Sequence, residues 1–349
     1  MRFCKAFIIF LLPITVSATS ASAREIVLNA VGDIMMAGSG VSVYKKLGYD
    51  YPFAATKAEL QRGDIAVGNL ESPVARGGRA FTEKRYHYRS APQAAAALRE
   101  AGFSVVTLAN NHMMDFGPSA LAETRRHLEN SGIACTGAGQ SLAAARQPAV
   151  VQVSGRKIAF LAYSFTYPDT FYATVNRPGT APGLARYFRE DIARAREMAD
   201  YVVVSFHWGE ENATRPKTYQ VSAAHRAIDA GADLVLGHHP HVLQGIERYK
   251  NGVIFYSLGN FAFGTASRSA RTSVIARIHL ENGLKSVELV PLNVLNRDVH
   301  YQPKVLTGKE GKVVIDQLAR LSGRWNTTIT TVEGRYLVRL DDATRLAKR

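Results

Sequence analysis

Short apolar runs alternate with amphipathic stretches along most of this chain, and many of the runs end at a glycine or a polar residue. Runs of this length predict strands, and the alanine- and leucine-rich stretches between them predict helices. The predicted strands are residues 25–31, 65–67, 104–109, 201–206, 233–236 and 253–257, with hairpins at 150–153 with 157–164 and 273–280 with 284–292. The predicted helices are residues 54–60, 93–100, 121–130, 190–199, 219–230 and 312–321. This alternation indicates an α/β fold.

Two long segments between these elements have distinctive compositions. Residues 75–91 are rich in Gly, Arg and Tyr, which predicts an exposed loop, and we interpret Lys84 as one of its solvated cations. Tyr86 and Tyr88, interleaved with those cations, would also suit polymer binding. Residues 165–187 hold several prolines and aromatic residues, so we expect a structured loop over a site rather than a linker.

The two ends of the chain differ from its centre. Residues 1–23 have a basic start, a short apolar run interrupted by Pro13 and small residues before position 24, which predicts a cleavable signal peptide. A membrane anchor is the less expected alternative, because the run is short for a bilayer span. The protein is therefore expected in the periplasm or secreted. We expect one domain over residues 24–296 and a basic C-terminal appendage over residues 297–349.

Charge and cysteine content narrow the chemistry. The chain has 43 Lys and Arg against 29 Asp and Glu, a formal charge of +14. Removing the signal peptide with its two cations leaves +12, which favours anionic partners, although a basic surface without a particular ligand is an equally simple reading. We expect no nucleic-acid partner. Cys135 would be the single cysteine of the mature chain, so neither an internal disulfide nor a cysteine-ligated metal site is expected.

A histidine cluster follows the strand predicted at residues 233–236. His238, His239 and His241 come directly after Gly237. Each ring has two nitrogens that need partners, and the neutral imidazole is a common metal ligand. In an extended segment His239 and His241 would point the same way, since one residue lies between them. His238 would then point elsewhere and have a structural role.

Other polar residues also follow predicted strands. In an open α/β sheet the carboxyl ends of the strands face one crevice, so we expect these side chains to converge with the histidines. They are Asp33, Asn69, Glu71, Asn111, His112 and His207. Carboxylate, amide and imidazole ligands without a thiolate suit Zn²⁺, Mn²⁺ or Fe²⁺, and we expect one or possibly two such ions. A bound divalent ion could activate water at neutral pH.

Each of these residues also has a simpler structural interpretation. Asp33 could form a turn or cap a helix, and Glu71 could be a solvated loop acid. His112 could belong to a hydrogen-bonded turn. His207 could be a core histidine with its partners satisfied, and Asn260 could lie in a turn that closes the sheet.

Six ordered sequence blocks carry a resemblance to a known family. They are VGDIMM at 31–36, GNLESP at 68–73, LANNHMMDFG at 108–117, FHWGEE at 206–211, GHHPHVLQG at 237–245 and YSLGNFAF at 256–263. Together they resemble the CapA family of capsule poly-γ-glutamate synthesis proteins, which is related in fold to calcineurin-like metallophosphoesterases. The resemblance implies an exported protein with a four-layer α/β/β/α sandwich and a metal crevice. It also implies that His112 is the acid for the leaving group, and that the metal ligands are Asp33, Asn111, His207, His239 and His241.

The chain departs from the wider phosphoesterase pattern in three respects. Met35 stands where a second ligand of the first block is usual, and Asn69 stands where a bridging aspartate is usual. Glu71 could replace the missing carboxylate, so the site could hold either one ion or two. The acidic residue after the Asn-His pair is displaced from position 113 to Asp115.

Two functions are compatible with these features. One is a metal-dependent hydrolase of a phosphoester or of an amide in an anionic polymer, with His112 and Asp115 as its catalytic pair. The other is a non-catalytic accessory protein that binds an anionic polymer during capsule assembly or export, possibly with membrane proteins of that machinery. The expected substrate-binding residues are Asn69, Trp208, Glu210 and Asn260.

Overall fold

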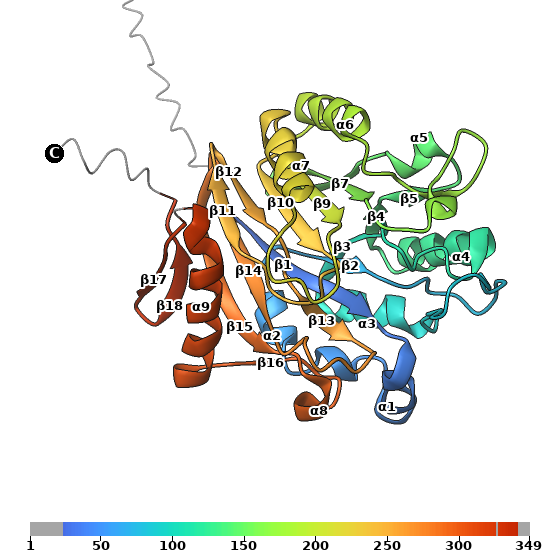
Figure 1. Cartoon of the computed structure of the whole chain (residues 1–349), viewed down its shortest axis with the longest axis horizontal. Helices are drawn as coiled ribbons and strands as arrows, with labels where there is room; N and C mark the ends of the chain where they lie inside the picture. Colours follow the sequence, from blue (N-terminus) through green and yellow to red (C-terminus); the bar gives the residue numbers. More distant parts are fainter. Residues whose placement is uncertain (1–23, 326, 341–349) are drawn as a thin grey trace, which may run out of the picture.

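Two β-sheets form the centre of the molecule in a computed structural model that describes residues 24–325 and 327–340 (Figure 1). The larger sheet has the order β17 (Ile329–Val332), β18 (Arg335–Val338), β15 (Leu284–Asn293), β14 (Thr272–Leu280), β1 (Ile26–Met35), β2 (Ile65–Leu70), β3 (Phe103–Thr107) and β4 (Ala134–Thr136). β13 (Asn260–Phe263) also pairs with β1, and β16 (Lys304–Val305) pairs with β15. The smaller sheet has the order β11 (Ile246–Tyr249), β12 (Gly252–Phe255), β10 (Leu234–His238), β9 (Tyr201–His207), β7 (Arg156–Ser164) and β6 (Ala149–Val153). β5 (Ala138–Gly139) and β8 (Gly179–Thr180) form a small separate pair.

The two sheets pack face to face through apolar side chains. Leu28 of β1 and Val67 of β2 belong to one buried cluster with Val203 of β9 and Leu236 of β10. Alternate residues of a strand point to opposite faces, so the same strands also bury an outer face. Helices cover both outer faces, which confirms the predicted four-layer α/β/β/α sandwich.

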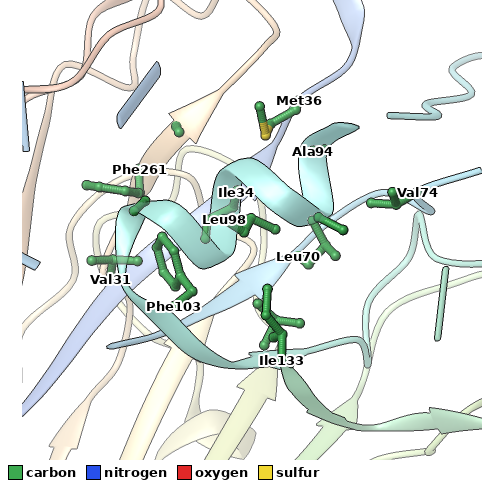
Figure 2. Packing of buried hydrophobic residues seen from close by; sticks show 14 of the residues in the cluster. Val31, Ile34, Met36, Leu70, Val74, Ala94, Leu98, Phe103, Ile133 and Phe261 are labelled. Carbon is green, nitrogen blue, oxygen red and sulfur yellow. The ribbon is translucent and has the colours of Figure 1, made fainter. Parts of the chain in front are cut away.

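The outer face of the larger sheet is covered by α1 (Val41–Leu47), α2 (Lys57–Gln61), α3 (Gln93–Ala101) and α4 (Gly117–Asn130). Figure 2 shows α3 lying over β1, β2 and β3, with Ala94 and Leu98 directed toward Ile34, Leu70 and Phe103. The outer face of the smaller sheet is covered by α5 (Leu142–Ala145), α6 (Ala185–Met198) and α7 (Thr218–Asp229).

Most predicted elements are found within a few residues of their expected bounds, and both hairpins are present. The largest difference concerns β1, which continues through Gly32 and Asp33 to Met35 instead of ending at residue 31. A bulge between Ala30 and Asp33 lets the strand leave its partner β14 and pair with β13. The helix expected at residues 54–60 is shorter, since α2 begins at Lys57, and a 3₁₀ turn, Tyr51–Phe53, precedes it.

The signal peptide expected at residues 1–23 lies outside the described residues. No helix in the part that the structure does describe is long and apolar enough to cross a membrane.

The C-terminal segment is part of the sandwich rather than an appendage. After α8 (Asn296–Val299), β16 pairs with β15 and β18 pairs with the same strand. α9 (Gly308–Ser322) lies along the sheet (Figure 1) and buries Val314, Ile315 and Leu318 in the cluster between the sheets. The sequence predicted this helix at residues 312–321, but not that its apolar face packs between the sheets.

This packing gives a stability prediction. We expect Leu318→Ala to lower the free energy of unfolding by about 2–5 kcal/mol, because Leu318 is 1% exposed and truncation leaves a cavity. Val313→Ala on the same helix is the matched control, since Val313 is 66% exposed and its loss should change stability by less than about 0.5 kcal/mol. Urea denaturation of both variants is the measurement. Equal, small effects would restore the appendage interpretation.

Candidate metal centre

Asp33 lies in the middle of the larger sheet, between two strands. In register it is opposite Asn69 of β2 and Asn260 of β13. The approach of β13 is close because position 32 is a glycine: a Cβ there would lie 1.9 Å from the carbonyl oxygen of Gly259. The predicted carboxylate is therefore held inside a strand and fully buried, so the turn and cap interpretations are wrong.

The histidines come from the smaller sheet, where β9 ends at His207 and β10 ends at His238. The backbone N–H of His239 donates to Asp33 Oδ2 at 3.0 Å and so joins the two sheets at the site. His239 and His241 have φ angles of 94° and 59°, so the segment is a left-handed turn and not the extended stretch we predicted. Such backbone costs roughly 1–3 kcal/mol per residue and persists where surrounding contacts impose it. The rings of His239 and His241 therefore come together through a left-handed turn, and not through the alternation of an extended strand.

Glu71 lies between these residues and is completely buried. Its Oε1 is 3.7 Å from His207 Nε2 and 3.7 Å from His241 Nε2, and neither carboxylate oxygen has a hydrogen-bond partner among the described residues. Potential ligand atoms within 4.8 Å of one another form two groups, Glu71 with His207 and His239, and Asp33 with Glu71 and His241. Glu71 is therefore common to both groups, and it is not a solvated loop acid.

This donor set fits divalent ions. A buried carboxylate without partners is costly, and a cation is the usual compensation. Asn111, just after β3, adds an amide oxygen, since its Oδ1 lies 2.9 Å from His207 Nε2. With carboxylate, imidazole and amide donors, the residues around Glu71 could hold two ions that share its carboxylate.

The electrostatics of the group follow from burial and close charges. Burial, together with the Asp33 carboxylate, raises the pKa of Glu71 well above its ordinary value. Burial alone would also raise the pKa of Asp33, but the imidazoles of His238 and His241, each 3.2 Å away, hold it well below the usual range. Burial lowers the pKa of His239 to about 3, whereas the carboxylates of Glu71 and Asp33 outweigh burial and raise the pKa of His241 to about 9. His239 thus favours the neutral form that binds metals.

Three buried residues orient the ligand side chains. Asn69 Nδ2 donates to Asp33 Oδ1 at 2.8 Å and lies 3.2 Å from His207 Nδ1, while Asn110 Nδ2 donates to Asn69 Oδ1 at 3.0 Å. His238 Nδ1 lies 3.2 Å from Asp33 Oδ1, so the histidine we set aside is structural but directed at the site. Asn69 is only 1% exposed, so its expected contact with substrate is corrected to a positioning role.

His112 and Asp115 lie side by side next to Asn111. His112 Nδ1 is 2.7 Å from Asp115 Oδ2, and burial lowers the pKa of His112 although Asp115 opposes the shift. Lys84 completes the group: its Nζ donates to Asp115 Oδ1 at 2.5 Å and to the Asn111 carbonyl at 2.6 Å. Lys84 is thus folded onto the site, contrary to the solvated loop we predicted. Nothing in the sequence distinguishes Lys84 from the other basic residues of this loop.

A cavity of about 340 Å³ opens beside His112 and His241. Its other lining residues are Tyr86, Tyr88, Glu211, Asn212, Asn260, Phe263, Thr265, Ala266 and Ser267. Asn260 lies here as expected, with Oδ1 2.9 Å from His241 Nδ1.

Like Asn69, two other residues expected to bind substrate do not line this cavity. Trp208 is 0% exposed, stacks on Phe206 and donates from Nε1 to the Tyr256 carbonyl at 2.9 Å, so it is a core residue. Glu210 points to solvent and pairs with Lys217 at 2.8 Å. Gly209, with a φ of 87°, turns the chain so that the next acid, Glu211, takes the place at the cavity. The sequence could not distinguish these adjacent acids.

The chain matches a protein family and several known proteins. The profile described as "Bacterial capsule synthesis protein PGA_cap" matches residues 27–265. The capsule biosynthesis protein CapA of Bacillus anthracis is 34% identical over 78% of this chain and 68% of its own length. The PGA biosynthesis protein CapA of Bacillus subtilis is 36% identical over 76% and 70%. Among solved structures, the NAD nucleotidase NadN of Haemophilus influenzae matches at 14% identity with a TM-score of 0.46, over 84% of this chain and 62% of that one.

Proposed function

This chain belongs to the bacterial capsule synthesis protein PGA_cap family, and from that premise we propose that it is an exported metal-dependent hydrolase acting on an anionic, polymer-linked substrate. The proposal is carried by the buried carboxylate of Glu71, which has no hydrogen-bond partner among the described residues and is grouped with His207 and His239 on one side and with Asp33 and His241 on the other. Export rests on the signal-like residues 1–23. A divalent ion held by these residues would supply a Lewis acid and an activated water.

The chain's own residues supply the remaining steps of a hydrolysis. His112 lines the cavity, and its Nδ1 is held by Asp115, so Nε2 is the ring atom left to give a proton to a leaving oxygen or nitrogen. The rings of His112 and Tyr88 pack edge to face, with their centroids 4.8 Å apart, and this contact fixes the plane of the His112 ring. Lys84 donates to Asp115 Oδ1 at 2.5 Å and so holds this carboxylate in place.

A second function, polymer binding without turnover, is favoured by a separate observation. The names of both Bacillus relatives describe biosynthesis rather than hydrolysis. In that case the metal would organise the cavity, and the basic surface would hold an anionic chain during assembly or export, beside membrane proteins of the same pathway.

Metal dependence is the first test. We expect the purified mature protein to contain Mn, Zn or Fe and to lose thermal stability in a chelator, by about 2.7 kcal/mol if free metal had stood at a hundred times its dissociation constant. Metal analysis, thermal unfolding and turnover on phosphodiester and polyglutamyl panels are the measurements. A metal-free protein whose stability ignores chelator would overturn both functions; a metalloprotein inert on every substrate would leave only the accessory function.

A further inference from the structure

The cavity beside His112 continues into a second, strongly basic groove. This groove has a volume of about 510 Å³ and is lined by Ala266, Ser267, Arg268, Arg271, Leu295 and Arg297. Ala266 and Ser267 line both the groove and the site cavity, so the two share a wall. A chain that left the site past this wall would meet three guanidinium groups.

The groove is a built feature of the fold. The side-chain amide of Asn296 donates to the carbonyls of Phe263 and Thr265, at 2.7 and 2.8 Å, and so ties α8 to the segment that follows β13. The backbone N–H of Val294 donates to the Arg271 carbonyl at 3.0 Å. These bonds hold the two sides of the groove at a fixed separation.

The guanidinium groups remain available for a ligand. Arg297 is paired with Asp298, its neighbour in sequence, at 3.4 Å, but its side chain is 81% exposed. Arg271 Nε donates to the Arg268 carbonyl at 3.3 Å, and Arg268 and Arg271 are both exposed. Three cations in one groove repel one another, which an anionic ligand would relieve, and guanidinium groups match carboxylates in a planar fork.

We propose that the groove of Arg268, Arg271 and Arg297 binds successive carboxylates of an extended anionic chain whose scissile bond lies in the cavity at His112. The proposal rests on the proposed function for the reacting bond, but binding in the groove does not require turnover. Carboxylates are favoured over a run of phosphates because Glu211 lines the cavity and gives the path a mixed charge near the site, where a denser polyanion would be repelled.

The test compares two triple variants with equal loss of charge. The first triple variant removes the three positive charges of the groove and carries R268Q, R271Q and R297Q. R215Q, R320Q and R324Q together remove the same charge from another basic pocket, of about 560 Å³, which shares no lining residue with the site cavity. Binding of a fluorescent glutamate oligomer is measured by anisotropy at low salt, and turnover is measured on a small phosphodiester that is too short to reach the groove.

We expect the groove variant to bind the oligomer about tenfold more weakly, since exposed ion pairs contribute up to a few-fold each. Its turnover of the small substrate should be unchanged, and the remote variant should bind like the wild type. Equal weakening in both variants, or none in the groove variant, overturns the proposal, as does tighter binding of polyphosphate than of the oligomer. Loss of all turnover in the wild type with groove-dependent binding intact would refute the hydrolase and leave the groove standing.

Discussion

Glu71→Gln should abolish metal binding at both candidate positions, because the same carboxylate belongs to both groups of potential ligands. An amide retains the shape of the side chain but loses the charge that a shared ligand needs. We expect metal content, measured by plasma mass spectrometry, to fall close to zero and turnover to disappear. Glu210→Gln is the matched control, since Glu210 is exposed and paired with Lys217 away from the cavity, and it should keep its metal. A Glu71→Gln protein that retains two ions would refute the shared position.

The same variant should behave in the opposite way once metal is absent. Without a cation Glu71 is a buried carboxyl with a raised pKa, so at neutral pH its ionised form opposes folding. In chelator we expect Glu71→Gln to be more stable than the wild type by about 1–4 kcal/mol, as for other replaced buried charges. The difference should vanish as the pH falls below the ordinary glutamate range, where the wild-type carboxyl is protonated in both folded and unfolded chains. Chelated wild type that is the more stable of the two at neutral pH would contradict this account.

His112→Ala should abolish turnover while leaving the metal in place. His112 is not among the residues of either ligand group, and it is placed to donate a proton to the leaving group. We expect a loss of about 10²–10⁴-fold in kcat on an alkyl ester, whose leaving group needs a proton. On a nitrophenyl ester, whose leaving group needs none, the loss should be much smaller. Steady-state kinetics on this substrate pair, with metal analysis of the same samples, make the measurement.

His127→Ala on α4 is the control, since His127 pairs with Glu123 and lies outside the cavity lining. It should leave both substrates unaffected. An equal loss on the two esters in His112→Ala would indicate a structural role for the ring. Loss of metal in that variant would place His112 among the ligands.

Much of this architecture could be predicted from the sequence. Apolar runs with β-branched residues indicate the strands, because a strand buried between two layers needs apolar side chains on both faces. The glycines at the ends of these strands allow neighbouring backbones to approach closely. Because Asp33, Glu71, His207 and the histidine cluster all follow predicted strands, we could expect them to converge on one crevice, but not which side chains would meet. The second sheet was predicted from the family resemblance.

Other features were decided only by the tertiary structure. Glu71 is common to both groups of potential ligands because it follows β2 directly and lies 3.7 Å from both His207 and His241, a proximity that no spacing in the chain encodes. Lys84 contacts Asp115 because its loop folds back on the site. The positive φ of Gly209 turns the chain so that Glu211, and not Glu210, lies at the cavity. The sequence determined which residues end each strand, because periodicity is local. The packing of two sheets determined which of those side chains meet, because it depends on contacts between residues far apart in the chain.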